Sequence, residues 1–426
     1  MTSAPSRTPG TASRAPALDP ADAAERALRH QKVRDAMAEE GLDALIAFAP
    51  GWRRENVRYF TDARLTGTAS FVLFPASGSA SAEVCAFSTR RADLPALRAA
   101  GWVDHAAVLD AHDPSALTEP LRDLRPRRVG VAHLELLPGL LAEALRRALP
   151  DAELVSASAL MDRVRMVKSD WELARMRRSA AVCAAGWQAF VDVLEPGLPE
   201  YRIVAEVEAE IKRLGAEDNF MLIASGGDEV RGMTAPTPRS LEAGDMVRTE
   251  LTPQMDGYWL QICRSAVVGP PSDGQRRSFD LFNESVEAGM AATRPGVTAH
   301  DVAKAQNDVF RKYGYGEYCT SKYTRVRGHG HGLHLDETPI IEGNETVLPE
   351  NAVFIIHPNT YTPLAGYHVL GDPVRVTKDG PEVLIATERK LFHSDKGSSA
   401  GRAGAAGAPA GAAEEPGTPS GKESAA

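Results

Sequence analysis

The first half of the chain alternates between helix-like and strand-like patterns of apolar positions. A helix-like segment runs from residue 27 to residue 37, and short apolar runs follow at 44–48, 71–74, 84–87 and 129–132. Short apolar runs between amphipathic stretches are typical of buried strands that alternate with helices. The pattern therefore predicts an α/β domain over residues 26–163.

A helix-start signal marks the beginning of a second domain. Ser169 is followed three residues later by Glu172, and an amphipathic pattern continues to Phe190, which predicts a long helix with a capping box. Helix-like segments at 200–214, 278–292 and 299–313 then alternate with strand-like segments at 246–251, 258–268, 353–357 and 374–377. The pattern predicts an α+β domain over residues 164–394, with an antiparallel sheet covered by helices.

The two ends of the chain differ in composition from the rest. Residues 1–25 are rich in Pro, Ala, Ser and Thr, and residues 395–426 are rich in Gly and Ala, with few large apolar side chains. Such segments bury too little apolar surface to offset the entropy lost on ordering. We expect a disordered tail at each end.

Composition and charge narrow the class of function. The 426 residues are 43% hydrophobic and 25% charged, as in soluble two-domain proteins. A net charge of −9 disfavours binding to nucleic acid or to an anionic membrane. The four cysteines form no CxxC pair, and neither a signal peptide nor a membrane span is visible. We expect a cytoplasmic protein with a small-molecule substrate, no nucleic-acid partner and no membrane partner.

Several segments resemble, in order, signature segments of the pita-bread superfamily, which includes creatinase, prolidase, aminopeptidase P and methionine aminopeptidase. In the second half they are GDMVRTELTPQMDGYWLQICRS, RGHGHGLHLDETP, LPENAVFIIHPNTY and VLGDPVRVTKDGPEVL. In the first half GLDALIAFAP and NVRYFTDA resemble the N-terminal creatinase or prolidase domain. The resemblance implies a creatinase-like α/β domain followed by an α+β pita-bread domain, and it also implies a homodimer.

The metal-binding positions of that superfamily are altered in this chain. Typical members hold two divalent ions with two Asp, one His and two Glu. The corresponding residues here are Glu250, Gln261, His329, His357 and Gly371. Four carboxylates are reduced to one, and neither an amide nor a hydrogen bridges two cations as a carboxylate does. The resemblance therefore implies the fold without a dinuclear metal centre.

Two kinds of site remain. The first has no cofactor, as the resemblance to creatinase and ectoine hydrolase implies. Its catalytic residues are Glu250, His329 and His357, with Glu250 as nucleophile or general base. It hydrolyses a C–N bond in a small amino-acid-derived amide or amidine. The second holds one divalent transition metal on His329, His357 and either Glu250 or Gln261. It would make the chain a relative of Xaa-Pro aminopeptidases or dipeptidases with a mononuclear site.

Further residues are candidates for substrate binding, and they are Gln261, Arg264, Tyr258, Asp336 and Glu337. The planar guanidinium of Arg264 suits a substrate carboxylate, although it also suits an acid of the protein itself.

Other polar residues near these motifs have simpler interpretations. We expect Cys263 to be a small buried residue and His331 and His334 to be solvated turn residues. A non-catalytic peptide-binding module remains an alternative to an enzyme. Lyase or cyclase chemistry remains an alternative to hydrolysis, because a Glu and His pair also supports proton abstraction.

Overall fold

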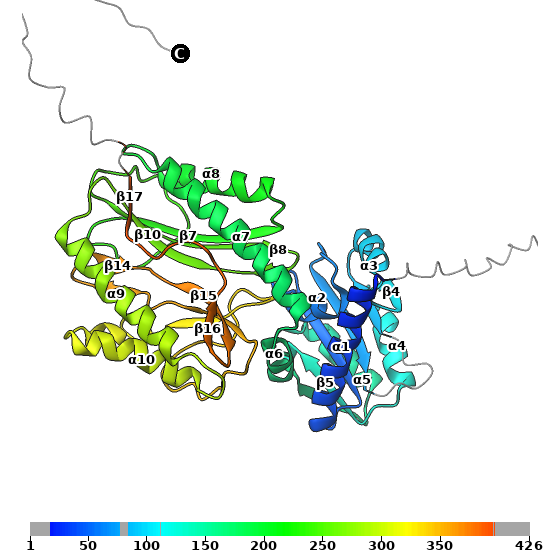
Figure 1. Cartoon of the computed structure of the whole chain (residues 1–426). Helices are drawn as coiled ribbons and strands as arrows, with labels where there is room; N and C mark the ends of the chain where they lie inside the picture. The colour runs from blue at the N-terminus through cyan, green and yellow to red at the C-terminus, as the bar shows by residue number, and fades with distance from the viewer. Residues whose placement is uncertain (1–17, 77–83, 111, 395, 397–426) are drawn as a thin grey trace, which may run out of the picture.

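The computed structural model describes residues 18–76, 84–110, 112–394 and 396, which form two domains lying side by side (Figure 1). Helix α1 begins at Pro20, and the side chain of Asp19 caps it by accepting hydrogen bonds from the first turn. The expected N-terminal tail is therefore wrong for residues 20–25. Residues 1–17 of that tail and nearly all of the expected C-terminal tail lie outside the described residues.

The N-terminal domain is built on a six-stranded sheet in the order β4-β3-β2-β1-β5-β6. Its strands are β1 (Ala44–Pro50), β2 (Ala69–Pro75), β3 (Cys85–Ser88), β4 (His105–Val108), β5 (Arg128–Ala132) and β6 (Glu153–Ser156). Its helices are α1 (Pro20–Glu39), α2 (Glu55–Thr61), α3 (Leu94–Ala100), α4 (Ser115–Asp123), α5 (Gly139–Ala148) and α6 (Ser158–Met166), with short 3₁₀ helices η1 (Arg91–Asp93) and η2 (Leu134–Leu136). The α/β prediction for this domain is confirmed.

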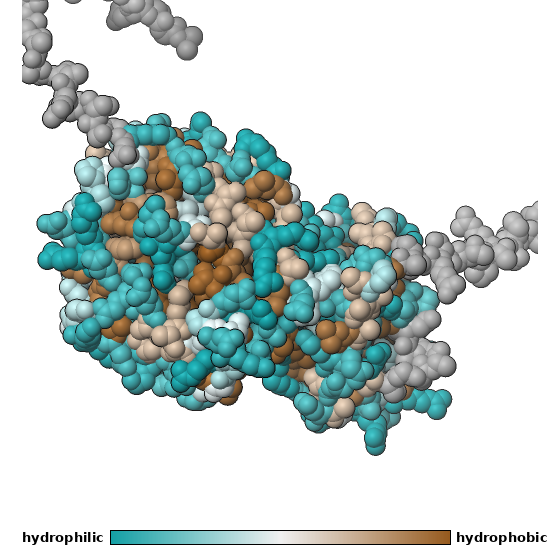
Figure 2. All heavy atoms as spheres, in the orientation of Figure 1, coloured by the Kyte–Doolittle hydropathy of each residue, from teal (hydrophilic) through white to brown (hydrophobic). Residues whose placement is uncertain are grey.

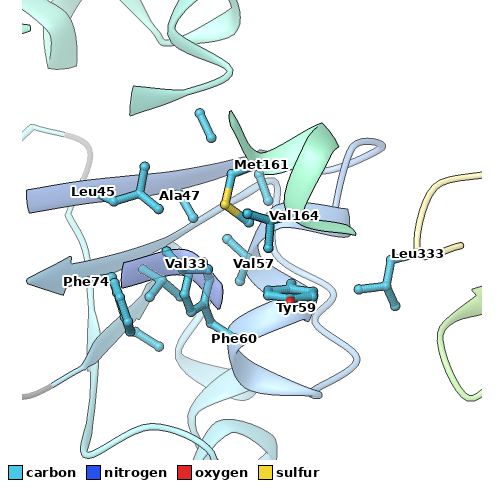
Figure 3. Close-up of a cluster of buried hydrophobic side chains, with 14 of the residues drawn as sticks. Val33, Leu45, Ala47, Val57, Tyr59, Phe60, Phe74, Met161, Val164 and Leu333 are labelled. Atoms are coloured by element: carbon cyan, nitrogen blue, oxygen red, sulfur yellow. The ribbon is translucent and has the colours of Figure 1, made fainter. Parts of the chain in front are cut away.

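The apolar core of this domain extends into the second domain. Val33, Leu45 and Phe74 pack in one buried cluster, and Leu333 approaches it from the second domain (Figure 3). Tyr258, also from the second domain, belongs to the same cluster. The domains are therefore joined by buried apolar contacts, which stabilise their relative position.

The C-terminal domain contains two sheets and a hairpin. The first sheet has the order β17-β10-β8-β7 with β9 added beside β8, the second has the order β11-β12-β15-β16, and β13 pairs with β14. The strands are β7 (Asp218–Gly226), β8 (Met246–Met255), β9 (Tyr258–Trp259), β10 (Ile262–Val268), β11 (Gly328–Gly330), β12 (Val353–Ile356), β13 (Thr360–Thr362), β14 (Gly366–His368), β15 (Asp372–Thr377), β16 (Gly380–Val383) and β17 (Phe392–Ser394). Most pairs are antiparallel, and β10 with β17 is parallel.

Two pairs of helices cover these sheets. They are α7 (Asp170–Val193) and α8 (Glu200–Arg213), which contact the first sheet, and α9 (Asp273–Ala292) and α10 (Ala299–Lys312), which pack together, with α9 against the second. A short 3₁₀ helix, η3 (Gly316–Cys319), follows α10. The capping box is confirmed, because Ser169 Oγ accepts from the Glu172 amide at 3.1 Å and Glu172 Oε2 accepts from the Ser169 amide at 3.0 Å. The expected α+β domain covered by helices is confirmed.

A buried arginine reinforces the junction between the domains. Arg29 of α1 donates from Nη2 to the Tyr258 hydroxyl at 2.6 Å, and that hydroxyl donates to Glu172 at 3.0 Å. Trp102 and Trp171 lie 5.0 and 4.9 Å from the guanidinium carbon, in cation–π geometry. Tyr258 is fully buried in this junction, which corrects the expectation that it binds substrate.

On the face drawn in Figure 2, hydrophilic and hydrophobic residues are interspersed. None of the helices in the described residues is both long enough and apolar enough to span a bilayer.

Candidate active site

The one carboxylate left at the metal-ligand positions is Glu250, on β8. It lies opposite Cys263 of β10 in the antiparallel register, and its Oε1 accepts a hydrogen bond from Asn359 Nδ2 at 2.7 Å. Burial raises the pKa of Glu250 to about 7, with the charge of Asp336 adding to the effect and the Asn359 hydrogen bond opposing it. A carboxyl group with this pKa both takes and returns a proton near neutral pH.

Three histidines form a cluster at the second sheet. His329 lies on β11 and His357 directly follows β12, and the centroids of their rings are 5.3 Å apart. His331 lies with its ring 4.8 Å from that of His329. Burial lowers the pKa of all three, so the imidazoles are neutral at pH 7. His331 is fully buried, and the expectation of a solvated turn residue is wrong because the Gly-His-Gly segment before it is a strand of the second sheet.

The imidazole nitrogens of this cluster are available for a ligand. Both ring nitrogens of His331 and both of His357 are buried without a hydrogen-bond partner in the described part of the chain. Leaving a buried polar group unpaired costs about 1–3 kcal/mol, so buried groups of this kind are normally satisfied. Ordered water or a bound ligand would satisfy these four nitrogens.

The site does not fit the two metal ions of the superfamily. A Cβ atom at Gly371 would lie 2.5 Å from His357 Cβ and 2.5 Å from the Ile356 carbonyl oxygen. His357 therefore occupies the space that a carboxylate at residue 371 would need. Gln261 is buried, and its Nε2 lies 3.2 Å from Cys263 Sγ. With one carboxylate the donor set cannot offset the repulsion between two divalent cations.

A single metal is a separate case. Two imidazoles and one carboxylate are donor types that Zn²⁺ and Fe²⁺ accept, and the unpaired nitrogens fit that chemistry. Within the ranges that the structure describes, however, no three His, Cys, Asp or Glu side chains are grouped closely enough to hold a metal ion. The arrangement as it stands is therefore not a formed metal site.

Arg264 has a structural partner in place of a substrate. It is fully buried, forms an ion pair with Asp372, and donates to the Gly371 carbonyl at 2.8 Å. The guanidinium is paired within the protein by these contacts, which corrects the expectation that it binds a substrate carboxylate. Cys263 beside it is buried as expected, and burial raises the pKa of its thiol.

Asp336 and Glu337 line a polar cleft of about 350 Å³ together with His334, which is half-buried. Asp336 is largely exposed, with Oδ1 3.6 Å from His329 Nδ1, so it remains accessible to a substrate. Glu337 accepts a hydrogen bond from Lys168 Nζ at 3.2 Å and forms an ion pair with Arg165. Its carboxylate is therefore already paired with cations of the protein.

Sequence reasoning missed Asn359. It lies two residues after His357 and is buried, and its side chain holds Glu250 and accepts from the Leu370 amide at 3.2 Å. An Asn after a His-Pro pair is an ordinary turn signal, so only the distance to Glu250 in the folded chain reveals its role.

The two-domain fold and this site define a pita-bread hydrolase. Residues 29–167 match the Creatinase/Prolidase N-terminal domain, and residues 174–378 match Metallopeptidase family M24. The probable dipeptidase PepE of Mycobacterium tuberculosis is 30% identical over 360 residues, which is 81% of this chain and 90% of that protein. The chain belongs to metallopeptidase family M24 and is a hydrolase of that family.

Other relatives agree with this assignment. The Xaa-Pro dipeptidase of Pyrococcus horikoshii is 29% identical over 259 residues, or 60% of this chain and 73% of the relative. The crystal structure of dipeptidase PepE from Mycobacterium ulcerans superposes with a TM-score of 0.72 at 26% identity, over 87% of this chain and 98% of that one. The X-Pro aminopeptidase of Thermotoga maritima has a TM-score of 0.75 at 22% identity, over 85% and 99%. That last likeness supports the fold alone.

The contact between Gly371 and His357 gives a test of the site's packing. We expect Gly371→Ala to lower the free energy of unfolding by about 1–3 kcal/mol, because the added methyl group has no room. Gly139→Ala is the matched control, since a Cβ there meets nothing within 4 Å. Urea titration of both variants measures the effect, and equal stabilities would contradict the close approach.

Proposed function

We propose that the chain hydrolyses the amide bond of a small amino-acid-derived substrate such as a dipeptide, at the site formed by Glu250, His329 and His357. The observation that carries the proposal is a buried carboxyl group with a pKa of about 7 on β8, connected through the Cys263–Gly371 bridge to the sheet that carries the buried neutral imidazoles. The dipeptidase names of the relatives support the substrate class. They favour it over cleavage of an amidine of the creatinase type, which no relative reported above supports.

The proton balance of the reaction fits these groups. The Glu250 carboxylate takes a proton from a water molecule, whose oxygen forms a bond to the amide carbon. The resulting carboxylic acid returns the proton to the amide nitrogen as the C–N bond breaks. Neutral imidazoles of His329 and His357 donate N–H groups to the negative charge that develops on the carbonyl oxygen.

A second candidate is the same hydrolysis at a site with one divalent transition metal. The unpaired nitrogens of His331 and His357 favour it, and so does membership of a metallopeptidase family. The metal would supply a Lewis acid for the carbonyl oxygen. The homodimer and the cytoplasmic location expected from the sequence stay predictions.

Replacing the acid–base group tests the main proposal. We expect Glu250→Gln to lower kcat for a dipeptide by about 10²–10⁴-fold, because an amide cannot accept the proton. Burial has raised the pKa from 4.5 to about 7, so the protonated form is favoured by folding. That stabilisation is present below pH 4.5 and is lost as the pH rises through about 7.

The variant should therefore be more stable than the wild type at pH 8, by about 3 kcal/mol, with the difference shrinking towards pH 5. Stability measured by urea titration at both pH values separates lost chemistry from lost folding. Glu382→Gln, at a partly exposed ion pair on β16, is the control and should keep full activity. Undiminished turnover by Glu250→Gln would refute the assignment.

The pH profile gives an independent prediction. If Glu250 acts as a base, kcat/KM rises with pH, and this rising limb is centred near pH 7. A carboxyl group with its ordinary pKa of 4.5 would instead centre the limb near pH 4.5. Asn359→Ala removes a hydrogen bond that lowers this pKa, so the limb should move upwards by about one pH unit. Asn283→Ala on the exposed face of α9 should leave it in place. A downward shift in Asn359→Ala would contradict the role of the Asn.

Metal analysis decides between the two candidates. Protein purified without chelator is expected to contain less than about 0.1 equivalent of transition metal if the main proposal holds. Dialysis against chelator should then leave both turnover and thermal stability unchanged. Binding of close to one equivalent, with loss of stability on chelation, would establish the single-metal candidate.

A further inference from the structure

A second cleft lies in the C-terminal domain and has a different chemical character. It has a volume of about 730 Å³, and four tyrosines and two cations line it: Tyr318, Tyr323, Tyr361, Tyr367, Arg231 and Lys322. Tyr318 comes from η3, Tyr361 from β13 and Tyr367 from β14. A concave surface with several convergent aromatic groups is typical of a small-molecule site.

The aromatic side chains form one cluster. The rings of Tyr318 and Tyr323 have centroids 4.9 Å apart in an edge-to-face arrangement, and Tyr318 and Tyr361 are 5.5 Å apart in the same way. Tyr323 and Tyr361 are nearly parallel at 5.9 Å. That spacing is within the range of direct ring contact, so a ligand ring packs against the cluster rather than between these two side chains.

The two cations decide the charge of the ligand. The guanidinium carbon of Arg231 lies 3.7 Å from the Tyr361 ring centroid, and Lys322 Nζ lies 5.4 Å from that of Tyr323. Aromatic faces that already carry a cation do not attract a second one. Neither Arg231 nor Lys322 forms an ion pair within the described residues. An acid that does adjoin the cleft, Glu317, is hydrogen-bonded to Tyr318. The cleft therefore favours an anion.

The cleft adjoins the candidate active site. Tyr367 is buried in a cluster with Cys263, which is the strand partner of Glu250. Burial and the charge of Glu250 both raise the pKa of the Tyr367 hydroxyl, which places the two side chains within electrostatic reach. That hydroxyl also lies 3.2 Å from Thr324 Oγ1 at the wall of the cleft. Tyr367 therefore connects the wall of the cleft to the surroundings of Glu250.

We propose that this cleft is the specificity pocket of the enzyme and that it binds an aromatic group next to a carboxylate. An aromatic ring and a carboxylate occur together on the carboxyl-terminal residue of a dipeptide, and also on an N-acyl aromatic amino acid. The preferred substrates are then small amides with a carboxyl-terminal Phe, Tyr or Trp. The substrate assignment rests on the proposed hydrolysis, whereas the binding preference does not.

Binding can be measured without turnover in the full-length Glu250→Gln protein. By calorimetry we expect N-acetyl-L-phenylalanine to bind at least about tenfold more tightly than two comparison compounds. They are N-acetyl-L-proline, which has no aromatic ring, and phenethylamine, which carries the opposite charge. Equal affinity for the proline compound or for the amine would overturn the proposal.

Two variants in the same background locate the binding site. Arg231→Gln and Tyr361→Leu should each weaken binding of N-acetyl-L-phenylalanine by about five- to tenfold. Lys312→Gln is the matched control, because Lys312 also covers a tyrosine ring, that of Tyr313, at 4.7 Å but lies outside the cleft. Unchanged binding in Arg231→Gln and Tyr361→Leu would refute the location.

Hydrolysis by the wild-type protein separates this inference from the proposed function. We expect kcat/KM for Ala-Phe to exceed that for Ala-Pro by about tenfold. If N-acetyl-L-phenylalanine binds selectively but neither dipeptide is cleaved, the proposed pocket is supported and the proposed hydrolysis is refuted. If both dipeptides are cleaved equally well and binding shows no preference for the aromatic compound, the proposed hydrolysis is supported and the proposed pocket is refuted.

Discussion

The two sheets of the C-terminal domain are joined beside the candidate active site by a bridge between Cys263 and Gly371. Their backbones exchange two hydrogen bonds, of 3.2 and 3.0 Å, and Arg264 donates to both carbonyl oxygens. Glu250 stands opposite Cys263, and His357 packs against Gly371. The bridge thus brings a carboxylate from one sheet and an imidazole from the other to the same place. A side chain at residue 371 would collide with His357 and with the Ile356 carbonyl, so the glycine is what allows His357 to pack at this point.

The altered ligand positions are consistent with one another in electrostatic terms. Five buried ligands with four negative charges are stable only around cations, because isolated buried carboxylates carry a large desolvation penalty. Here one carboxylate remains, its pKa is raised, and an amide donates to it. The other positions hold an amide, a hydrogen and imidazoles whose burial keeps them neutral. The substitutions therefore make a pocket that carries little buried charge without metal ions.

The sequence predicted those features that depend on local pattern. The Ser169 capping box and the amphipathic helices follow from spacing along the chain. The roles of Arg264 and Tyr258 could not be predicted, because their partners Asp372 and Arg29 lie 108 and 229 residues away. Burial of His331 depends in the same way on the pairing of β11 with β12. The tyrosine cleft had no signal either, since its residues come from separate loops and strands.

Buried arginines explain how those loops are held in place. Arg248 donates to the carbonyl oxygens of Gly227 at 3.0 Å and Ala365 at 2.6 Å, so it ties the segment leading to Arg231 to the β13–β14 hairpin. Arg327 donates to Thr324 at 2.8 Å and Asn359 at 3.3 Å, and connects the loop that carries Tyr323 to the residue that holds Glu250. Burying a guanidinium group is unfavourable unless its donors are met, and here backbone carbonyls meet most of them. Because one arginine contacts both the cleft loop and the residue that holds Glu250, movement of the aromatic wall would disturb Glu250. If the proposed function and pocket hold, these contacts would couple substrate fit to proton transfer.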